Sequence, residues 1–134
     1  ARSARFATAY ARVGLSPDGG TSWHLARALP RALAAELLMC GDLVQAERLH
    51  ALGLVNRLAD TGQALQAALD LADTLHGRAP NALASCKELL DEAAHQPLSA
   101  QLDLERAHFL RNLTHANAGE GIAAFLDKRT PHWR

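Results

Sequence analysis

Aromatic residues are scarce in this chain of 134 residues, where they make up 4%, although hydrophobic residues make up 49%. The apolar residues are mainly alanine and leucine. Such residues favour packed helices over a sheet, which would use more β-branched and aromatic side chains. The length is that of about one domain, able to bury roughly two thirds of its unfolded surface. The composition therefore predicts a mainly helical chain.

A net charge is also lacking, because fourteen basic residues balance fourteen acidic ones. Nothing in the charge favours binding to nucleic acid or to an anionic membrane surface. No apolar run approaches the ~20 residues of a membrane span, and no signal peptide is visible. We therefore expect neither nucleic acid nor a membrane as a partner.

Cysteine is limited to Cys40 and Cys86, each within an apolar helical pattern. This pattern predicts small buried thiols in a reducing compartment, which indicates a cytoplasmic protein. The histidines form no His-x-x-x-His pair, and no cysteine or carboxylate accompanies them at the spacing of metal ligands. We expect no metal site.

Proline and glycine divide the chain into short helical segments. The spacing of apolar residues predicts helices over 21–28, 31–40, 44–52, 63–76, 81–94 and 98–114. Two short strands are expected, one within 3–13 and one over 54–58.

A further helix is expected near the C-terminal end of the sequence. Asn117, with Glu120 three residues later, resembles a capping box at its start. The helix is predicted to bury Ile122, Phe125 and Leu126. It ends in the cations Lys128 and Arg129, which the helix dipole favours there.

The turn Pro17-Asp18-Gly19-Gly20 carries the first candidate chemistry. Proline fixes its own φ and glycine allows positive φ, so the turn leads into the helix at Thr21. Asp18 has two interpretations. It is either a turn residue whose carboxylate accepts backbone N–H bonds, or a base that moves a proton beside a thioester carbonyl. The second also requires an oxyanion hole, which this stretch does not supply.

An ordered set of motifs runs through nearly all of the 134 residues. Its members are Phe6, Gly14-Leu15-Ser16-Pro17-Asp18-Gly19-Gly20, Leu25-Ala26-Arg27, Arg31-Ala32-Leu33-Ala34-Ala35-Glu36-Leu37, Gly41-Asp42, Ala46, Gly53-Leu54-Val55-Asn56, and Glu120-Gly121 through Phe125 to Lys128-Arg129. Each piece is weak alone, but the ordered set resembles the C-terminal half of the enoyl-CoA hydratase/isomerase (crotonase) family. The resemblance implies a mainly α fragment, with about six to seven helices and one or two short strands, of the α/β crotonase spiral fold.

The resemblance also implies an organisation. Residues 1–60 would end the spiral core and carry the active-site turn, and 61–134 would form a helical region for trimerisation and for covering CoA. The implied partners are an acyl-CoA thioester and further copies of the chain, as a trimer or hexamer. No separate cofactor is implied, because coenzyme A is part of the substrate. The N-terminal half that supplies the oxyanion hole is missing from this sequence, so we expect the chain alone to be inactive.

Two departures refine this interpretation. Tyr10 stands where hydratases of the family have one of two catalytic glutamates, which makes simple water addition the alternative rather than the first choice. The pattern from Phe6 to Asp18 instead resembles the ring-epoxide and Δ3,Δ2-enoyl-CoA isomerases of phenylacetate and fatty-acid catabolism, in which the aspartate acts as acid/base. Pro30, where the family usually has glycine, affects only the local turn.

Three other residues are candidates for binding. The resemblance implies that Phe125 and Lys128 meet the adenine and ribose-phosphate end of CoA, and phosphate recognition suits a lysine. Otherwise they are a buried aromatic and a solvated helix-end cation. Trp23 either lines an acyl pocket or packs. A different class of function, a non-catalytic helical module for self-association or acyl-CoA binding, also fits the composition.

Overall fold

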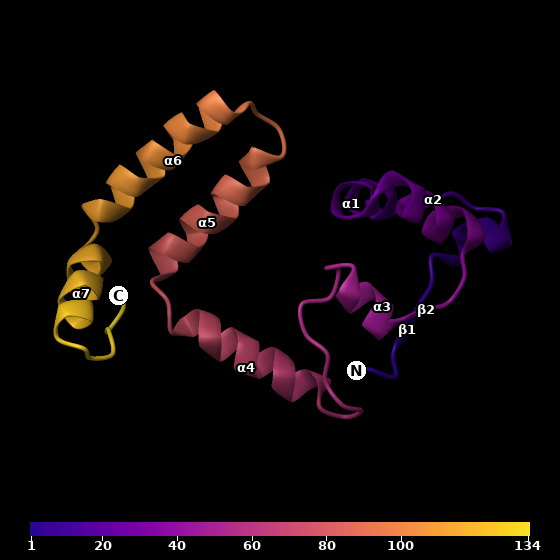
Figure 1. The fold of residues 1–134 in the computed structure, drawn as a ribbon, viewed down its shortest axis with the longest axis horizontal. Helices are drawn as coiled ribbons and strands as arrows, with labels where there is room; N and C mark the ends of the chain where they lie inside the picture. Colours follow the sequence, from indigo (N-terminus) through magenta and orange to yellow (C-terminus); the bar gives the residue numbers. More distant parts are fainter. The chain divides into compact units, whose positions relative to one another are not determined.

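The chain is built mainly from helices. The computed structural model describes residues 1–134, which divide into two units, Ala1–Leu69 and Asp70–Arg134. Seven α-helices, one 3-10 helix and two short strands follow one another along the chain (Figure 1). The predicted helical architecture with one or two strands is confirmed. None of the helices has the length and apolar character needed to cross a membrane.

A two-stranded antiparallel pairing lies in the first unit. Strand β1 (Arg5–Phe6) pairs with β2 (Val44–Gln45), with Phe6 opposite Val44. The strand predicted within 3–13 is therefore only two residues long. The chain then enters the 3-10 helix η1 (Ala9–Val13), and the hydroxyl of Thr8, directly before η1, donates to the backbone carbonyl of Leu37.

Three helices complete the first unit: α1 (Thr21–Ala28), α2 (Arg31–Cys40) and α3 (Ala46–Ala51). The bounds of α1 and α2 are those that the sequence predicts. Gly41 ends α2 with a φ of 64°, a conformation that glycine adopts without the steric cost of a Cβ atom. Helix α3 begins two residues after its predicted start, because Val44 and Gln45 pair with β1.

An apolar core holds the first unit together. Leu29, Leu37 and Leu49 come from three separate segments and are each less than one tenth exposed. Leu54 and Val55 pack against this core, and their backbone N–H groups both donate to the carbonyl of Leu49. These bonds form a tight turn, so the strand predicted over 54–58 is wrong.

Four helices follow: α4 (Ala64–His76), which crosses the boundary between the units, α5 (Pro80–Ala93), α6 (Leu98–Leu113) and α7 (Ala116–Leu126). Helices α5 and α6 run side by side in opposite directions, and α7 packs on α6 (Figure 1). Proline suits the first position of α5, where a backbone N–H would have no helical partner.

A chain of side-chain amides links α5, α6 and α7. Asn117 donates to Asn81, Asn81 donates to Asn112, and Asn112 donates to the Ser85 hydroxyl, at 2.7, 2.7 and 2.8 Å. We call these four residues the asparagine chain. Asn117 is 2% exposed and Ser85 3%, so these bonds satisfy polar groups that burial would otherwise penalise.

The predicted capping box is therefore wrong. His115 is the residue that caps α7, and its Nδ1 accepts a bond from the backbone N–H of Asn117 at 3.1 Å. The Asn117 side chain is occupied by long-range partners, and Glu120 binds Arg129 instead of reaching back to the helix start.

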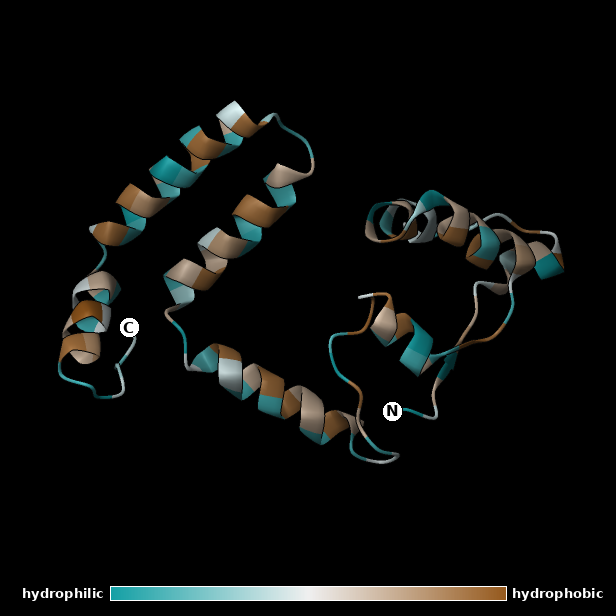
Figure 2. Ribbon diagram, in the orientation of Figure 1, coloured by the Kyte–Doolittle hydropathy of each residue, from teal (hydrophilic) through white to brown (hydrophobic).

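The apolar face of α7 is open in this chain. Ile122, Phe125 and Leu126 are 56%, 82% and 71% exposed, although the sequence pattern predicts their burial. The helices carry both apolar and polar residues (Figure 2), and the apolar stripe on α7 is more than half exposed in the second unit. The cysteines likewise differ from expectation, because Cys40 and Cys86 are exposed free thiols.

Candidate active site

The turn that carries Asp18 is shaped by glycine. Gly14 ends η1 with a φ of 76°, and Gly19 and Gly20 have φ of 57° and 80° before α1 begins. Residues with a Cβ adopt this left-handed conformation at a cost. The sequence thus dictates a tight entrance to α1 with Asp18 directly before the glycine pair.

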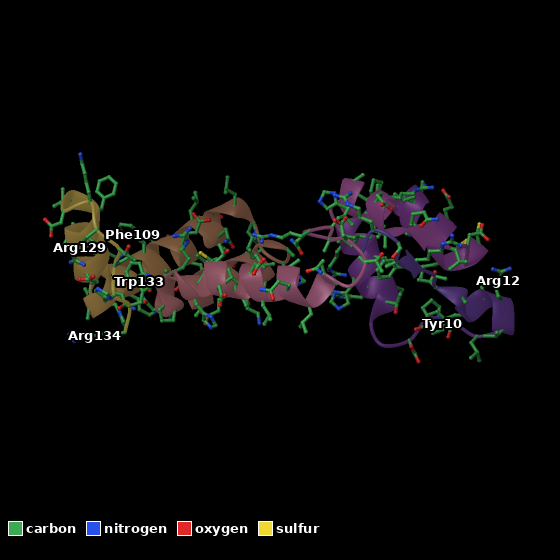
Figure 3. The ribbon with its side chains drawn as sticks, turned by 90° about the horizontal axis from the view of Figure 1, so that it is seen from below. Tyr10, Arg12, Phe109, Arg129, Trp133 and Arg134 are labelled. Carbon is green, nitrogen blue, oxygen red and sulfur yellow. The ribbon has the colours of Figure 1, made fainter.

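Both ends of Asp18 make hydrogen bonds. Its backbone carbonyl accepts from the N–H and the hydroxyl of Thr21, at 3.0 and 2.8 Å. Its carboxylate oxygen Oδ1 accepts from the Tyr10 hydroxyl at 2.8 Å. Tyr10 projects from η1 (Figure 3). The carboxylate is exposed in this chain, so it is oriented by specific bonds but not shielded from water.

Trp23 is the third residue of α1, within its first turn, and is 48% exposed. The guanidinium carbon of Arg27 lies 3.8 Å from the centre of its ring, a cation–π contact. The His24 ring meets it edge-on, with centroids 4.8 Å apart. Trp23 and Asp18 thus belong to the same turn-and-helix segment, at the entrance to α1.

Lys128 has an unusual backbone. It is the single non-glycine residue with positive φ, at 54°. Its N–H donates to the carbonyl of Phe125 at 3.3 Å, and the next N–H, of Arg129, donates to the carbonyl of Ala124 at 3.0 Å. This bonding is the Schellman ending of a helix, in which glycine usually occupies the position of Lys128. The turn therefore presents an exposed lysine directly after α7.

A charged clamp holds that turn. Arg129 donates to both carboxylate oxygens of Glu120, at 2.7 and 3.0 Å, and the His132 N–H donates to Glu120 at 2.8 Å. The hydrogen bond from Arg129 is the main cause, and that from the His132 backbone the second, of a Glu120 pKa lowered from 4.5 to about 2. These bonds favour the ionised carboxylate.

The tail beyond α7 folds back onto the second unit. The side-chain amide of Asn117 pairs with the backbone of Arg134, accepting its N–H at 2.9 Å and donating to its carbonyl at 3.0 Å. The Trp133 indole N–H donates to the Gly77 carbonyl at 3.0 Å, and the ring packs near Gly121. Arg129, Trp133 and Arg134 gather at this end of the unit (Figure 3).

The candidate residues fall into two pairs. Asp18 and Trp23 belong to the first unit, and Phe125 and Lys128 to the second. A cavity of about 260 Å³ in the first unit is lined by α2 and the segment before α3 and does not include Asp18. Two cavities among the helices of the second unit, of about 570 and 390 Å³, include neither Phe125 nor Lys128.

No group of three histidine, cysteine, aspartate or glutamate side chains lies together in a way that could hold a metal ion. The structure does reveal a partner that sequence reasoning missed, the hydroxyl of Tyr10. The sequence shows a tyrosine eight residues before the aspartate of a glycine-rich turn. This spacing alone does not show that η1 places the tyrosine hydroxyl against the aspartate carboxylate.

Comparison with known proteins identifies a family. The family model described as enoyl-CoA hydratase/isomerase matches residues 1–134. The chain is 35% identical over 133 residues to 1,2-epoxyphenylacetyl-CoA isomerase of Escherichia coli K12, a match that covers 99% of the chain and 51% of that protein. It is 33% identical to carnitinyl-CoA dehydratase of Salmonella typhi, over 100% of the chain and 53% of that protein.

Solved structures agree. An enoyl-CoA hydratase from Polaromonas sp. JS666 superimposes with a TM-score of 0.98 and 63% identity, over 100% of this chain and 52% of that one. The chain thus spans about half the length of the relatives that it matches.

Proposed function

Because this chain belongs to the enoyl-CoA hydratase/isomerase family, we propose that it forms part of an acyl-CoA enzyme that transfers a proton on an enoyl-CoA thioester. Asp18 is the group that removes and returns the proton. The observation that carries the proposal is the match of the family over all of residues 1–134, together with a carboxylate at the entrance to α1 that the Tyr10 hydroxyl orients.

The chemistry requires two things of the protein. A base must lie at a fixed place beside the carbon that loses its proton, and donors must stabilise the negative charge that moves onto the thioester oxygen. The hydrogen bonds of Asp18 to Tyr10 and Thr21 support the first role. We assign the second role, and the cover that keeps water from Asp18, to the part of the relatives' length that this chain does not span.

Binding of CoA falls in this proposal to the end of α7. Lys128 offers an exposed ammonium for a phosphate, and Phe125, 82% exposed, offers a ring face for adenine. Trp23 follows Asp18 on the same helix entrance and is proposed to line the acyl pocket. Coenzyme A belongs to the substrate, and no separate cofactor is invoked.

Assembly is part of the same proposal. The open apolar stripe of α7, with Ile122, Phe125 and Leu126 exposed, supports packing against other protein, and we propose a homo-oligomer built on the 61–134 region, as a trimer or hexamer. We also propose that the 134-residue chain alone has no turnover.

Isomerisation is our first choice of reaction, supported by the similarity to the Escherichia coli isomerase and by the single carboxylate of the α1 turn. One observation favours a second candidate, water addition, because the Polaromonas structure that is 63% identical is described as an enoyl-CoA hydratase. Product analysis separates them: migration of the double bond in 3-enoyl-CoA supports the first, and 3-hydroxyacyl-CoA formed from 2-enoyl-CoA supports the second. A helical module without activity would give neither product.

The test of Asp18 uses the whole protein that carries this chain. Asp18→Asn keeps the shape of the side chain and removes the base, so we expect turnover to fall by at least about a hundredfold, within the range attributed to acid–base groups. Asp42→Asn, at another exposed aspartate beside a glycine, is the matched control and should retain activity. Unchanged turnover in Asp18→Asn would overturn the assignment.

A further inference from the structure

The two carboxylate oxygens of Asp18 differ in their hydrogen bonding. The Tyr10 hydroxyl donates to Oδ1 at 2.8 Å, and a carboxylate carries two oxygens that each accept bonds. Because the phenol uses one of the two acceptor positions of Oδ1, Oδ2 is the oxygen with more capacity to exchange a proton with a ligand.

Backbone and side-chain hydrogen bonds on both sides of Tyr10 fix its position. The backbone carbonyl of Tyr10 accepts from the N–H of Leu15 at 3.0 Å, which closes η1 onto the turn. The segment before it is tied to α2, because the Thr8 hydroxyl donates to the carbonyl of Leu37. The fit is close: a Cβ atom on Gly41 would lie 3.3 Å from the Thr8 carbonyl and 3.2 Å from the Arg12 side chain. The phenol therefore reaches Asp18 from a support anchored to the apolar core.

The other end of Asp18 is held independently. Both the N–H and the hydroxyl of Thr21 bind its backbone carbonyl. The main chain of Asp18 is thus fixed by α1 and its carboxylate by η1. Without the phenol, only the intrinsic preference of an exposed side chain would set the direction of the carboxylate, since exposed side chains change rotamer within nanoseconds.

We propose that Tyr10 is a positioning residue for the acid/base Asp18, which it holds in one rotamer with Oδ2 directed to the substrate. The inference rests on the proposed function of Asp18. Tyr10 does not touch the reacting atoms, and it acts through the carboxylate. Positioning of this kind affects the rate of the proton transfer more than the binding of the thioester, because misplacement of a reacting group is costly in the chemical step.

The test compares Tyr10→Phe with the unaltered whole protein, assayed on 3-enoyl-CoA. Phenylalanine keeps the ring and removes only the donor. Loss of a hydrogen bond to a charged group predicts a kcat lower by about ten- to a hundredfold. KM should stay within about twofold, since the thioester is bound elsewhere, and the unfolding temperature should remain within about 2 °C. Ser16→Ala removes a hydroxyl from the exposed loop between the two residues and is the control.

The outcomes are separable. A kcat within about twofold of the unaltered protein, or a loss that appears in KM or in the unfolding temperature instead, overturns the role of Tyr10 even where Asp18→Asn is inactive. If Asp18→Asn keeps full turnover, the proposed function of Asp18 fails and the role of Tyr10 fails with it. A fall in kcat alone for Tyr10→Phe, with Asp18→Asn inactive and Ser16→Ala unaffected, supports both.

Discussion

The two units of this chain are stabilised by opposite kinds of buried group. In Ala1–Leu69 the buried side chains are apolar, with Leu29, Leu37 and Leu49 at the centre. In Asp70–Arg134 the buried side chains are mainly polar, namely Ser85, His108 and Asn117, with Ala124 the one apolar exception. The first arrangement gains free energy from burial, which is not directional. The second gains specificity, because each polar group needs its own partner.

The difference bears on function. A unit with its own apolar core can hold a turn such as that of Asp18 in place. The second unit, whose helices α5, α6 and α7 are linked by the asparagine chain, exposes large apolar side chains, among them Phe125 and Leu126 of α7. The exposed stripe of α7 supports the proposed packing of this helix against other protein.

The largest effect is expected from the apolar core. Leu37→Ala should destabilise the protein by about 2–5 kcal/mol, since it removes buried methyl groups and leaves a cavity. Met39→Ala, on the same helix at a position 75% exposed, should cost less than about 0.5 kcal/mol. Hydrogen exchange measured by mass spectrometry should show faster exchange in α1 and α2 for Leu37→Ala, with a smaller change in α5 and α6. An equal increase in the hydrogen-exchange rate in both units would show that the apolar core of the first unit does not stabilise that unit separately.

A smaller loss is expected from the asparagine chain. Asn117→Ala leaves the side-chain oxygen Oδ1 of Asn81 and the backbone N–H of Arg134 without their partners. This loss predicts that the free energy of unfolding falls by about 1–3 kcal/mol. Here exchange should increase in α5, α7 and the tail. Asn56→Ala, at an exposed position, serves as the control. Full stability in Asn117→Ala would show that the buried amides do not hold this unit together.

A gain in stability is expected at Lys128. Glycine adopts its left-handed conformation without the steric cost that a side chain adds, so Lys128→Gly should stabilise the protein by up to about 1 kcal/mol after the entropy cost of glycine. Affinity for CoA should fall at the same time, because the ammonium is lost. Thermal unfolding with and without CoA measures both. If Lys128→Gly is more stable but binds CoA with unaltered affinity, Lys128 does not contribute to CoA binding.

The smallest effect depends on pH. The pKa of Glu120 is lowered from 4.5 to about 2 by its bonds to Arg129 and the His132 backbone. A lowered pKa means that this contribution to stability is fully present above pH 4.5 and is lost as the pH falls toward 2. Glu120→Gln should therefore weaken the dependence of the unfolding temperature on pH over that window. If the unfolding temperature of Glu120→Gln depends on pH as that of the unaltered protein does, other carboxylates cause the dependence.

Local signals in the sequence account well for the helices of the first unit. The range 31–40 followed by glycine predicts α2 and its end, because alanine and leucine favour the helix and Gly41 can take positive φ. Long-range bonds explain the failure of the predicted capping box. Asn117 has the local pattern of a cap, but its amide binds Asn81 and Arg134, which are distant in the sequence.

The candidate site was predictable in part. The turn signal at residues 17–20 identifies Asp18, since proline and glycine encode the bend locally. The bond from Tyr10 depends on η1 being anchored to α2, a tertiary relation that no local pattern contains. The exposure of Phe125 was not predictable either, because an apolar stripe indicates that a face will be covered without indicating which protein segment covers it.

The proposed role of Asp18 is to transfer a proton on an enoyl-CoA thioester. Incubation of the whole protein with 3-enoyl-CoA deuterated at C2, followed by NMR and mass spectrometry of the thioester, tests this directly. We expect the unaltered protein and Asp42→Asn to remove deuterium from C2, whether it reappears at C4 or is lost to water, and Asp18→Asn to leave almost all of it at C2. Equal removal of deuterium from C2 by Asp18→Asn would show that another group takes the proton.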